Sequence, residues 1–297
     1  RITYKGYVRS DKQKDNLNDL VLSELNLIAN SSYKGFEAKK LHLLFQAAYY
    51  LNTGNYKSAI RFYQELIALF ESNQHLILNP PIYYLSAIKG VLDSLHTAGL
   101  YKEMPFFIER LKKIQQGNYA TEFLLEISAC IYQYEQAALI NTGKLEEALH
   151  LSEENEDSLF KKVGLLRPET QLKLYLNTAI LHLCLGNPGK ARKSMKKIFS
   201  AGKQFYALPS YKTARLINLL IQAELGDYSF FENEINSIKR NMRYEKQTYQ
   251  TEKLLFRFVM GYPLPSYEKA RNKLWMQFQR EITKIRQDKY EKQLLKT

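Results

Sequence analysis

Apolar residues recur at helical spacing along most of the chain. In the segment that opens at Pro168 and closes at Gly186, they are Leu172, Leu174, Leu176, Ala179, Ile180 and Leu183. Steps of three and four place such residues on one side of an α-helix. This segment is apolar over much of its circumference, so neighbouring helices must cover it on more than one side. The pattern predicts an all-α protein.

The pattern predicts one helix at 16–30, followed by helix pairs. Proline is favoured at the first helical position, and Pro80–Pro81, Pro168 and Pro209 mark such starts. The segment 156–167 is the least regular and is predicted to be a loop. The predicted pairs span 35–53/55–72, 81–98/100–116, 119–142/144–155, 168–186/188–201, 209–225/228–241 and 244–260/265–293.

A glycine closes the first helix of five successive pairs. The positions are Gly54, Gly99, Gly143, Gly186 and Gly226, separated by 45, 44, 43 and 40 residues. Glycine reaches the left-handed backbone conformation without the penalty that a Cβ atom brings, so it is the usual residue just after a helix end. Near-constant spacing of this kind indicates a repeat of helical hairpins.

Two further positions are defined by their distance from the glycine. Two residues on, an aromatic or apolar side chain is expected to fill the gap between the paired helices: Tyr56, Tyr101, Leu145 and Tyr228. Five residues on, a small side chain lets the helix axes approach closely: Ala59, Ala148 and Ala191, with the larger Met104 in the second unit.

Ala47, Gly54, Tyr56, Ala59 and Tyr63 resemble the small–Gly–aromatic–Ala–aromatic pattern of a tetratricopeptide repeat. The resemblance covers about residues 35–241, and the period is 40–45 residues instead of 34. It implies a right-handed α-solenoid of about six pairs in a single domain, 1–297, capped by the helix at 16–30. The expected repeats are 35–72, 81–116, 119–155, 168–201, 209–241 and 244–293. Families of this shape bind peptides or proteins in a superhelical groove.

Polar residues within the first helices are the candidates for ligand contact, because these helices line the concave face of stacked pairs. The groove candidates are Lys89, Asp93, His96, Gln133, Tyr134, Asn141, Lys173, Asn177, Arg215 and Asn218. The alternative interpretation is that several of them only bond to a neighbouring helix or to water.

Charge is distributed unevenly between the two halves of the 297-residue chain. The net charge of +13 arises from −3 over residues 1–157 and +16 over residues 158–297. A basic patch is expected from Lys190, Arg192, Lys193, Lys196, Lys197, Lys239, Arg240 and Arg243. These are either ordinary solvated helix faces or a docking surface for an acidic protein, a nucleic acid or an anionic membrane. Tyr244, Tyr249 and Tyr267 lie among basic residues, as in some nucleic-acid-binding proteins.

No motif for catalysis, cofactor binding or metal binding is apparent. Gly186 to Lys190 lacks the spacing of a phosphate-binding loop, the five histidines form no His-x-x-x-His pair, and no Gly-x-Ser-x-Gly elbow occurs. Two cysteines exclude a disulfide scaffold, and both lie in apolar stretches, where a buried thiol is expected. We expect no enzyme activity, no cofactor and no metal site.

The sequence thus predicts a non-catalytic scaffold that binds a protein or peptide, with an acidic partner favoured by the basic half. Two alternatives stay open: the sensor or oligomerisation domain of a bacterial transcriptional regulator, and nucleic-acid binding through the basic half. No apolar run approaches the roughly 18 residues of a membrane span. We expect a cytoplasmic protein, although the chain begins at Arg1 and a targeting segment could precede it. The pattern makes no prediction of the oligomeric state.

Overall fold

The computed structural model describes residues 14–15, 18–19, 22–23, 35–77, 80–245, 249–288 and 291. Within these ranges the secondary structure is helical and no strand occurs, which confirms the predicted all-α class. The backbone divides into two compact units, Arg1–Ala138 and Leu139–Leu295. The single domain 1–297 stays a prediction.

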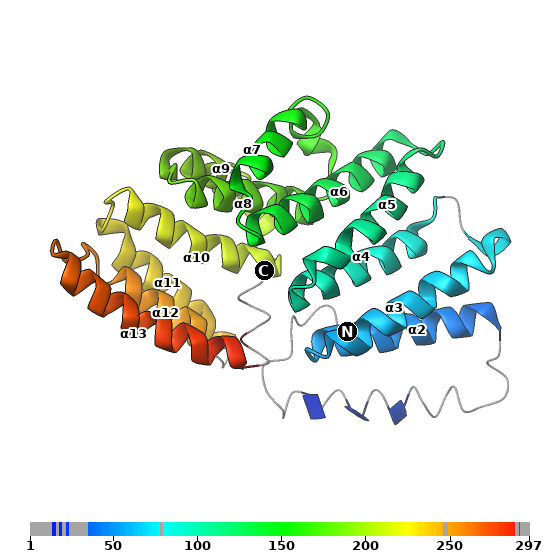
Figure 1. Ribbon diagram of the computed structural model, residues 1–297, viewed down its shortest axis with the longest axis horizontal. Coiled ribbons are helices and arrows are strands. Elements are labelled where there is room, and N and C mark those ends of the chain that lie inside the picture. Colours follow the sequence, from blue (N-terminus) through cyan, green and yellow to red (C-terminus); the bar gives the residue numbers. More distant parts are fainter. Residues whose placement is uncertain are drawn as a thin grey trace. The chain divides into compact units, whose positions relative to one another are not determined.

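The first unit contains two antiparallel helix pairs and most of a further long helix (Figure 1). Its elements are α2 (Phe36–Asn52), α3 (Tyr56–Glu71), the 3-10 turn η2 (Gln74–Leu76), α4 (Ile82–Ala98), the 3-10 turn η3 (Tyr101–Glu103), α5 (Met104–Gln115) and α6 (Thr121–Asn141). One hydrophobic core runs through the unit, and Leu66, Ile88 and Ile127 are fully buried within it. α2 packs against both α3 and α4, so the first helices of the two pairs touch.

The second unit contains one short helix and three helix pairs. Its elements are α7 (Leu145–Glu154), the 3-10 helix η4 (Phe160–Leu165), α8 (Pro168–Cys184), α9 (Pro188–Ser200), η5 (Gly202–Phe205), α10 (Pro209–Glu224), α11 (Ser229–Glu245), α12 (Gln250–Val259) and α13 (Glu268–Gln287). α10 contacts α8 before it and α12 after it. The first helices of successive pairs therefore lie against one another, which is the neighbour relation of a stacked array.

The five repeat glycines all adopt the left-handed conformation. Their φ angles lie between +70° at Gly186 and +79° at Gly143. After each glycine, the next backbone N–H donates to the carbonyl four residues before the glycine, at 2.8–3.0 Å. This is the Schellman arrangement, which satisfies a carbonyl left open at the helix end. The prediction that these glycines terminate helices is confirmed.

The position five residues after each glycine is buried in every pair. The side chains there are Ala59, Met104, Ala148 and Ala191, all fully buried, and Phe231, which is 4 % exposed. The position two residues after the glycine is less uniform. Tyr56, Tyr101 and Leu145 are half-buried, whereas Tyr228 is exposed and lies beside the Tyr262 ring. Close approach of the helix pairs is therefore set at the fifth position.

Several predicted helix boundaries differ from the observed ones. Segment 156–167, which was predicted to be a loop, contains the 3-10 helix η4 at 160–165, and Leu159, Val163 and Leu166 are buried in this segment. In the second pair, η3 occupies residues 101–103, so α5 begins only at Met104. The last two helices are shorter than predicted, at Gln250–Val259 and Glu268–Gln287.

Several predictions fall on residues outside the described ranges. Of the cap helix predicted at 16–30, residues 18–19 and 22–23 are described and helical, and the rest lie outside. Of the last predicted repeat, 246–248, 289–290 and 292–293 also lie outside. Among the helices that are described, none is long and apolar enough to cross a lipid bilayer.

Candidate interaction surfaces

Three groove candidates come together in the first unit. The Tyr134 hydroxyl on α6 donates to Asp93 Oδ1 on α4 at 2.7 Å and also lies 3.2 Å from the backbone carbonyl of Lys89. Burial, reinforced by the Asp93 carboxylate, raises the pKa of Tyr134 well above its usual value. Tyr134 is therefore a neutral hydrogen-bond donor that joins two first helices, while the Lys89 side chain is half-buried.

Two further groove candidates of the first unit are His96 and Gln133. His96 packs edge-on against Tyr101, with ring centroids 5.8 Å apart. Gln133 is half-buried, as is His96. Asn141, which the sequence analysis grouped with them, lies beyond the unit boundary and is exposed.

In the second unit, Arg215 joins two helices, and Asn218 bonds within its own helix. Arg215 Nε lies 2.7 Å from Glu234 Oε1, and its guanidinium also donates to Ser237 Oγ, so α10 is tied to α11. Asn218 is buried and accepts from Gln222 one turn away, at 3.3 Å. The structure therefore uses both residues internally, as the alternative interpretation held.

Lys173 and Asn177 keep partial solvent exposure on α8. The Lys173 ammonium lies 3.3 Å from Glu169 Oε1, an i,i+4 pair on an exposed helix face. Asn177 is half-buried one turn further along the helix. Exposed pairs of this kind contribute little to stability, so Lys173 can exchange its partner at small cost.

α9 has a solvent face made almost entirely of cations. Ala191, Met195 and Ile198 form its buried side. The opposite arc holds five exposed side chains, Lys190, Arg192, Lys193, Lys196 and Lys197. Within the described part of the chain, none of these five lies in ion-pair distance of a carboxylate. Lys197 instead lies over the Tyr175 ring, 5.3 Å from its centroid.

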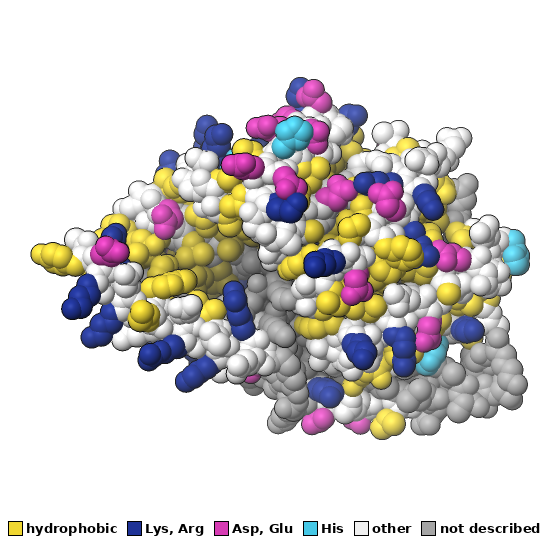
Figure 2. Space-filling model, in the orientation of Figure 1, with side chains coloured by type: hydrophobic (Ala, Val, Ile, Leu, Met, Phe, Trp, Pro, Cys, Tyr) yellow, Lys and Arg dark blue, Asp and Glu magenta, His cyan; other side chains and the backbone are white. Residues whose placement is uncertain are grey.

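α7 shows the opposite charge. It packs against α8, as α9 does, and buries Ala148. Its exposed residues include four glutamates, Glu146, Glu147, Glu153 and Glu154. These acidic side chains gather around the α7 position in Figure 2. An acidic and a basic helix face therefore flank α8 within one unit.

The remaining residues of the predicted basic patch lie on α11. Lys239 and Arg240 are exposed, and the Lys239 ammonium lies 5.7 Å from the centroid of the Phe256 ring. Arg243 lies in the same helix, but its side chain is outside the described part. α9 and α11 both pack against α10.

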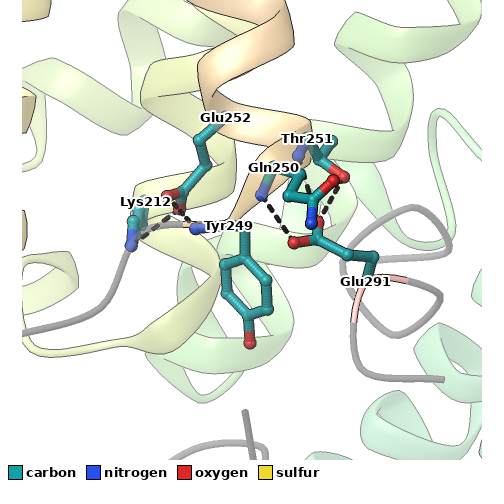
Figure 3. Close-up of polar contacts among 6 residues, drawn as sticks. All are labelled: Lys212, Tyr249, Gln250, Thr251, Glu252 and Glu291. Carbon is teal, nitrogen blue, oxygen red and sulfur yellow. Dashed lines mark hydrogen bonds and ion pairs between the residues drawn. The ribbon is translucent and has the colours of Figure 1, made fainter. Parts of the chain in front are cut away.

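The start of α12 holds a buried glutamate that the sequence analysis did not identify (Figure 3). Glu252 is fully buried, and its Oε2 accepts the N–H of Tyr249 at 3.0 Å. Its other oxygen lies 2.7 Å from the ammonium of Lys212 on α10. A buried carboxylate needs such a partner, because a charge that is removed from water and left unpaired is strongly unfavourable. Deleting one partner of a buried ion pair costs about 3–5 kcal/mol.

A second carboxylate reaches the same helix end from far along the chain. Glu291 Oε1 accepts the N–H of Gln250 at 2.5 Å, and its Oε2 accepts both the N–H and the hydroxyl of Thr251, at 3.0 and 2.7 Å (Figure 3). A negative group is favoured at a helix N-terminus, where backbone N–H groups lack helical partners. These contacts join the start of α12 to Glu291 and to Lys212 of α10.

α13 presents a surface that the sequence analysis missed. Leu274, Phe278 and Ile285 face α12, at steps of four and seven. Trp275 and Met276, out of phase with them, are 54 % and 59 % exposed. The sequence contains the information that these two side chains are exposed, because a side chain one or two positions beyond a buried helical residue points away from the core.

In the described ranges, no group of three or more His, Cys, Asp or Glu is placed to hold a metal ion. Cys130 is buried as expected, but Cys184 is exposed, because it ends α8 beyond the last fully covered turn. His182 is half-buried, and burial together with nearby Lys190 lowers the pKa of its imidazole.

A scan against models of known protein families, a search of curated proteins and a search of solved structures each found no significant match.

Proposed function

We propose that this protein is a non-catalytic helical-repeat scaffold of the tetratricopeptide-like kind, with a right-handed solenoid path, that binds an acidic protein or peptide. The observation that carries the proposal is the outer face of α9. Its five exposed cations have no carboxylate partner in the described structure. An acidic segment would supply the missing counter-charges.

The charge of α9 favours fast capture of such a segment. Several pairs of its cations lie three or four residues apart, at 190/193, 192/196 and 193/197, so the Cβ atoms of each pair lie about 5–6 Å apart along the helix surface. The excess of positive charge in residues 158–297 adds a long-range field of the same sign. Fields of this kind raise association rates at low salt and weaken as the Debye length shortens.

α8 adds a second point of contact for a bound peptide, in the same unit as α9. Asn177 is a half-buried polar side chain on α8. Lys173, one turn before it, is half-buried and pairs with Glu169. Both lie on a partly exposed side of the helix, unlike Arg215, whose ion pair with Glu234 joins two helices.

The test is fluorescence anisotropy with a fluorescein-labelled twelve-residue polyglutamate peptide. The variant Arg192→Glu/Lys193→Glu/Lys196→Glu inverts the centre of the α9 face, and we expect its affinity to fall about tenfold or more at low salt. The matched control is Lys57→Glu/Lys102→Glu/Lys113→Glu, because these lysines are exposed, lie in the first unit and change the net charge equally. We expect a much smaller loss there.

Two results would contradict the proposal. One is an absence of peptide binding by the unaltered protein at low salt. The other is an equal loss of affinity in both triple variants, which would show that net charge alone, and not the α9 face, attracts the peptide. Circular dichroism on both variants verifies that helicity is retained.

A further inference from the structure

The outer face of α13 differs from that of α9 in its chemistry. From Lys269 to Arg280 the helix contains no acidic residue. Glu281, which follows, is engaged by Arg257 of α12 at 2.5 Å. Figure 2 shows Lys and Arg side chains in a row along the α13 edge. The exposed cations of this stretch are Lys269, Arg271, Lys273 and Arg280.

Aromatic and amide groups lie among these cations. Trp275 is exposed, and it lies one helical turn from Arg271 and from Gln279. Asn272 and Gln277 are exposed on the same stretch, and Tyr267, at the N-cap of the helix, is 82 % exposed. α9 has five cations on its exposed arc and neither an exposed aromatic ring nor an amide side chain there.

We propose that the outer face of α13 binds single-stranded nucleic acid, with Trp275 as a stacking platform. Arg271, Lys273 and Arg280 would neutralise phosphates, and a base would stack on the indole ring. Combining a basic track with an aromatic face is how proteins hold unpaired strands without reading their sequence. The exposed amides can both donate to and accept from base edges.

An anionic bilayer fits this face less well. An amphipathic helix inserts its whole apolar side into the lipid surface. In α13 that side is already covered, because Phe278 and Ile285 are buried against α12. Only Trp275 and Met276 are left to insert.

An acidic peptide also fits the outer face of α13 less well, because its carboxylates would bind the cations and leave the aromatic ring without a partner. The exposed indole would gain nothing from a carboxylate, whereas every nucleobase offers a π-face to it. A duplex is disfavoured for the same reason, because its bases are stacked on one another already.

The experiment uses the fact that Trp275 is the only tryptophan in the chain. Its emission is measured on the full chain while a 15-nucleotide polyuridine RNA or the corresponding thymidine DNA is added at low salt. We expect either strand to quench the emission, because a stacked base quenches indole fluorescence directly. The DNA and RNA arms show whether the 2′-hydroxyl matters. Polyglutamate and phosphatidylserine vesicles are the comparison probes, and neither should quench.

Variants locate the contact by anisotropy of a labelled polyuridine strand. Trp275→Ala should weaken binding about tenfold, and Trp275→Phe much less, because phenylalanine keeps a stacking face. Arg271→Gln/Lys273→Gln/Arg280→Gln should lower the slope of log affinity against log salt by about 2. The matched control, Lys57→Gln/Lys102→Gln/Lys113→Gln, should leave that slope nearly unchanged.

Three outcomes would overturn the proposal. The strand may bind without quenching Trp275 and with full affinity in Trp275→Ala, which would place nucleic acid elsewhere. Polyglutamate may quench as strongly as polyuridine, which would make α13 a protein-docking face. Vesicles may shift the emission to the blue while polyuridine does nothing, which would indicate a membrane surface. None of these depends on whether α9 binds acidic peptides.

Discussion

α7 and α9 are both helices that follow a repeat glycine, and their solvent faces have opposite charge. Each follows a left-handed glycine, packs against α8 and buries an alanine five residues after that glycine, Ala148 in one and Ala191 in the other. Yet α7 exposes four glutamates and α9 exposes five cations. The comparison shows that the fold is specified by a few inward positions, which leaves the outward ones free to differ.

The difference between inward and outward positions has a simple energetic basis. A change at a fully buried position alters packing that is already close to crystal density, whereas an exposed charge changes stability by about 0.5 kcal/mol or less. Interaction properties can therefore diverge between neighbouring repeats at almost no cost to the hairpin.

The largest effect is expected at the two alanines. Ala148→Leu and Ala191→Leu each insert three carbon atoms where the helix pair has no space, and each should lower the free energy of unfolding by about 1–3 kcal/mol. Urea unfolding followed by circular dichroism measures the loss. If either substitution leaves the free energy of unfolding unchanged, the two alanines are not equivalent, and α7 and α9 do not share the same packing requirement.

A smaller and equal loss is expected at the two glycines. Gly143→Ala and Gly186→Ala leave space for the new Cβ atom, because nothing lies within 4 Å of it, so only the positive φ is penalised, by about 1–2 kcal/mol. Gly189 serves as the control: it lies in α9 without a positive φ and with equally open surroundings. Gly189→Ala should stabilise the protein by about 0.5–1 kcal/mol. A stabilising effect at Gly143 or Gly186 would refute the proposed role in helix termination.

Charge inversion on α7 tests the outward side of the comparison. Glu146→Lys/Glu153→Lys/Glu154→Lys gives α7 a basic face like that of α9. We expect the affinity for the polyglutamate peptide to be roughly threefold higher than that of the unaltered protein at low salt, and the difference between the two proteins to disappear at high salt. Anisotropy measures the change, and the urea midpoint should hardly move. A clear loss of stability would show that the acidic face also supports the fold.

The smallest effect concerns how far the field of α9 reaches into α8. Burial, and then Lys190, lower the pKa of His182 from its ordinary value of 6.5. Lys190→Gln should raise that pKa and still leave it below 6.5, because burial persists. Histidine NMR titration measures it.

The same shift predicts how stability depends on pH. Below pH 6.5 the unfolded chain takes up a proton at this residue before the folded chain does, so His182 lowers stability as the pH falls through this range. His182→Gln should flatten this part of the pH profile. An unchanged profile would show that other groups cause any acid destabilisation.

Much of the fold could be predicted because its determinants are local. A left-handed φ at Gly54 or Gly226 follows from the helix that precedes it, and burial of Ala59 follows from the length of the turn. The short helix η4 was missed because the buried residues in and beside it, Leu159, Val163 and Leu166, span too few turns for a period to be visible.

The contacts of the candidate site were less predictable. Polar residues of the first helices could be selected, but whether they point to solvent depends on the rotation of one helix against the next. Asp93 therefore meets Tyr134, and Arg215 meets Glu234, although the helical period shows neither pair. Trp275 could have been found, because Leu274 and Phe278 already define the inward side of α13.

The carboxylate of Glu291 also determines where the polypeptide can be shortened. It holds the backbone donors of Gln250 and Thr251 from 40 residues away, so the two ends of the last helical hairpin are closed on each other. A fragment that stops before residue 291 would open that loop and uncover two amides next to the Glu252–Lys212 pair. Truncations made to isolate the last repeats should therefore retain this glutamate, and removing it alone should loosen α12 more than any surface change on α13.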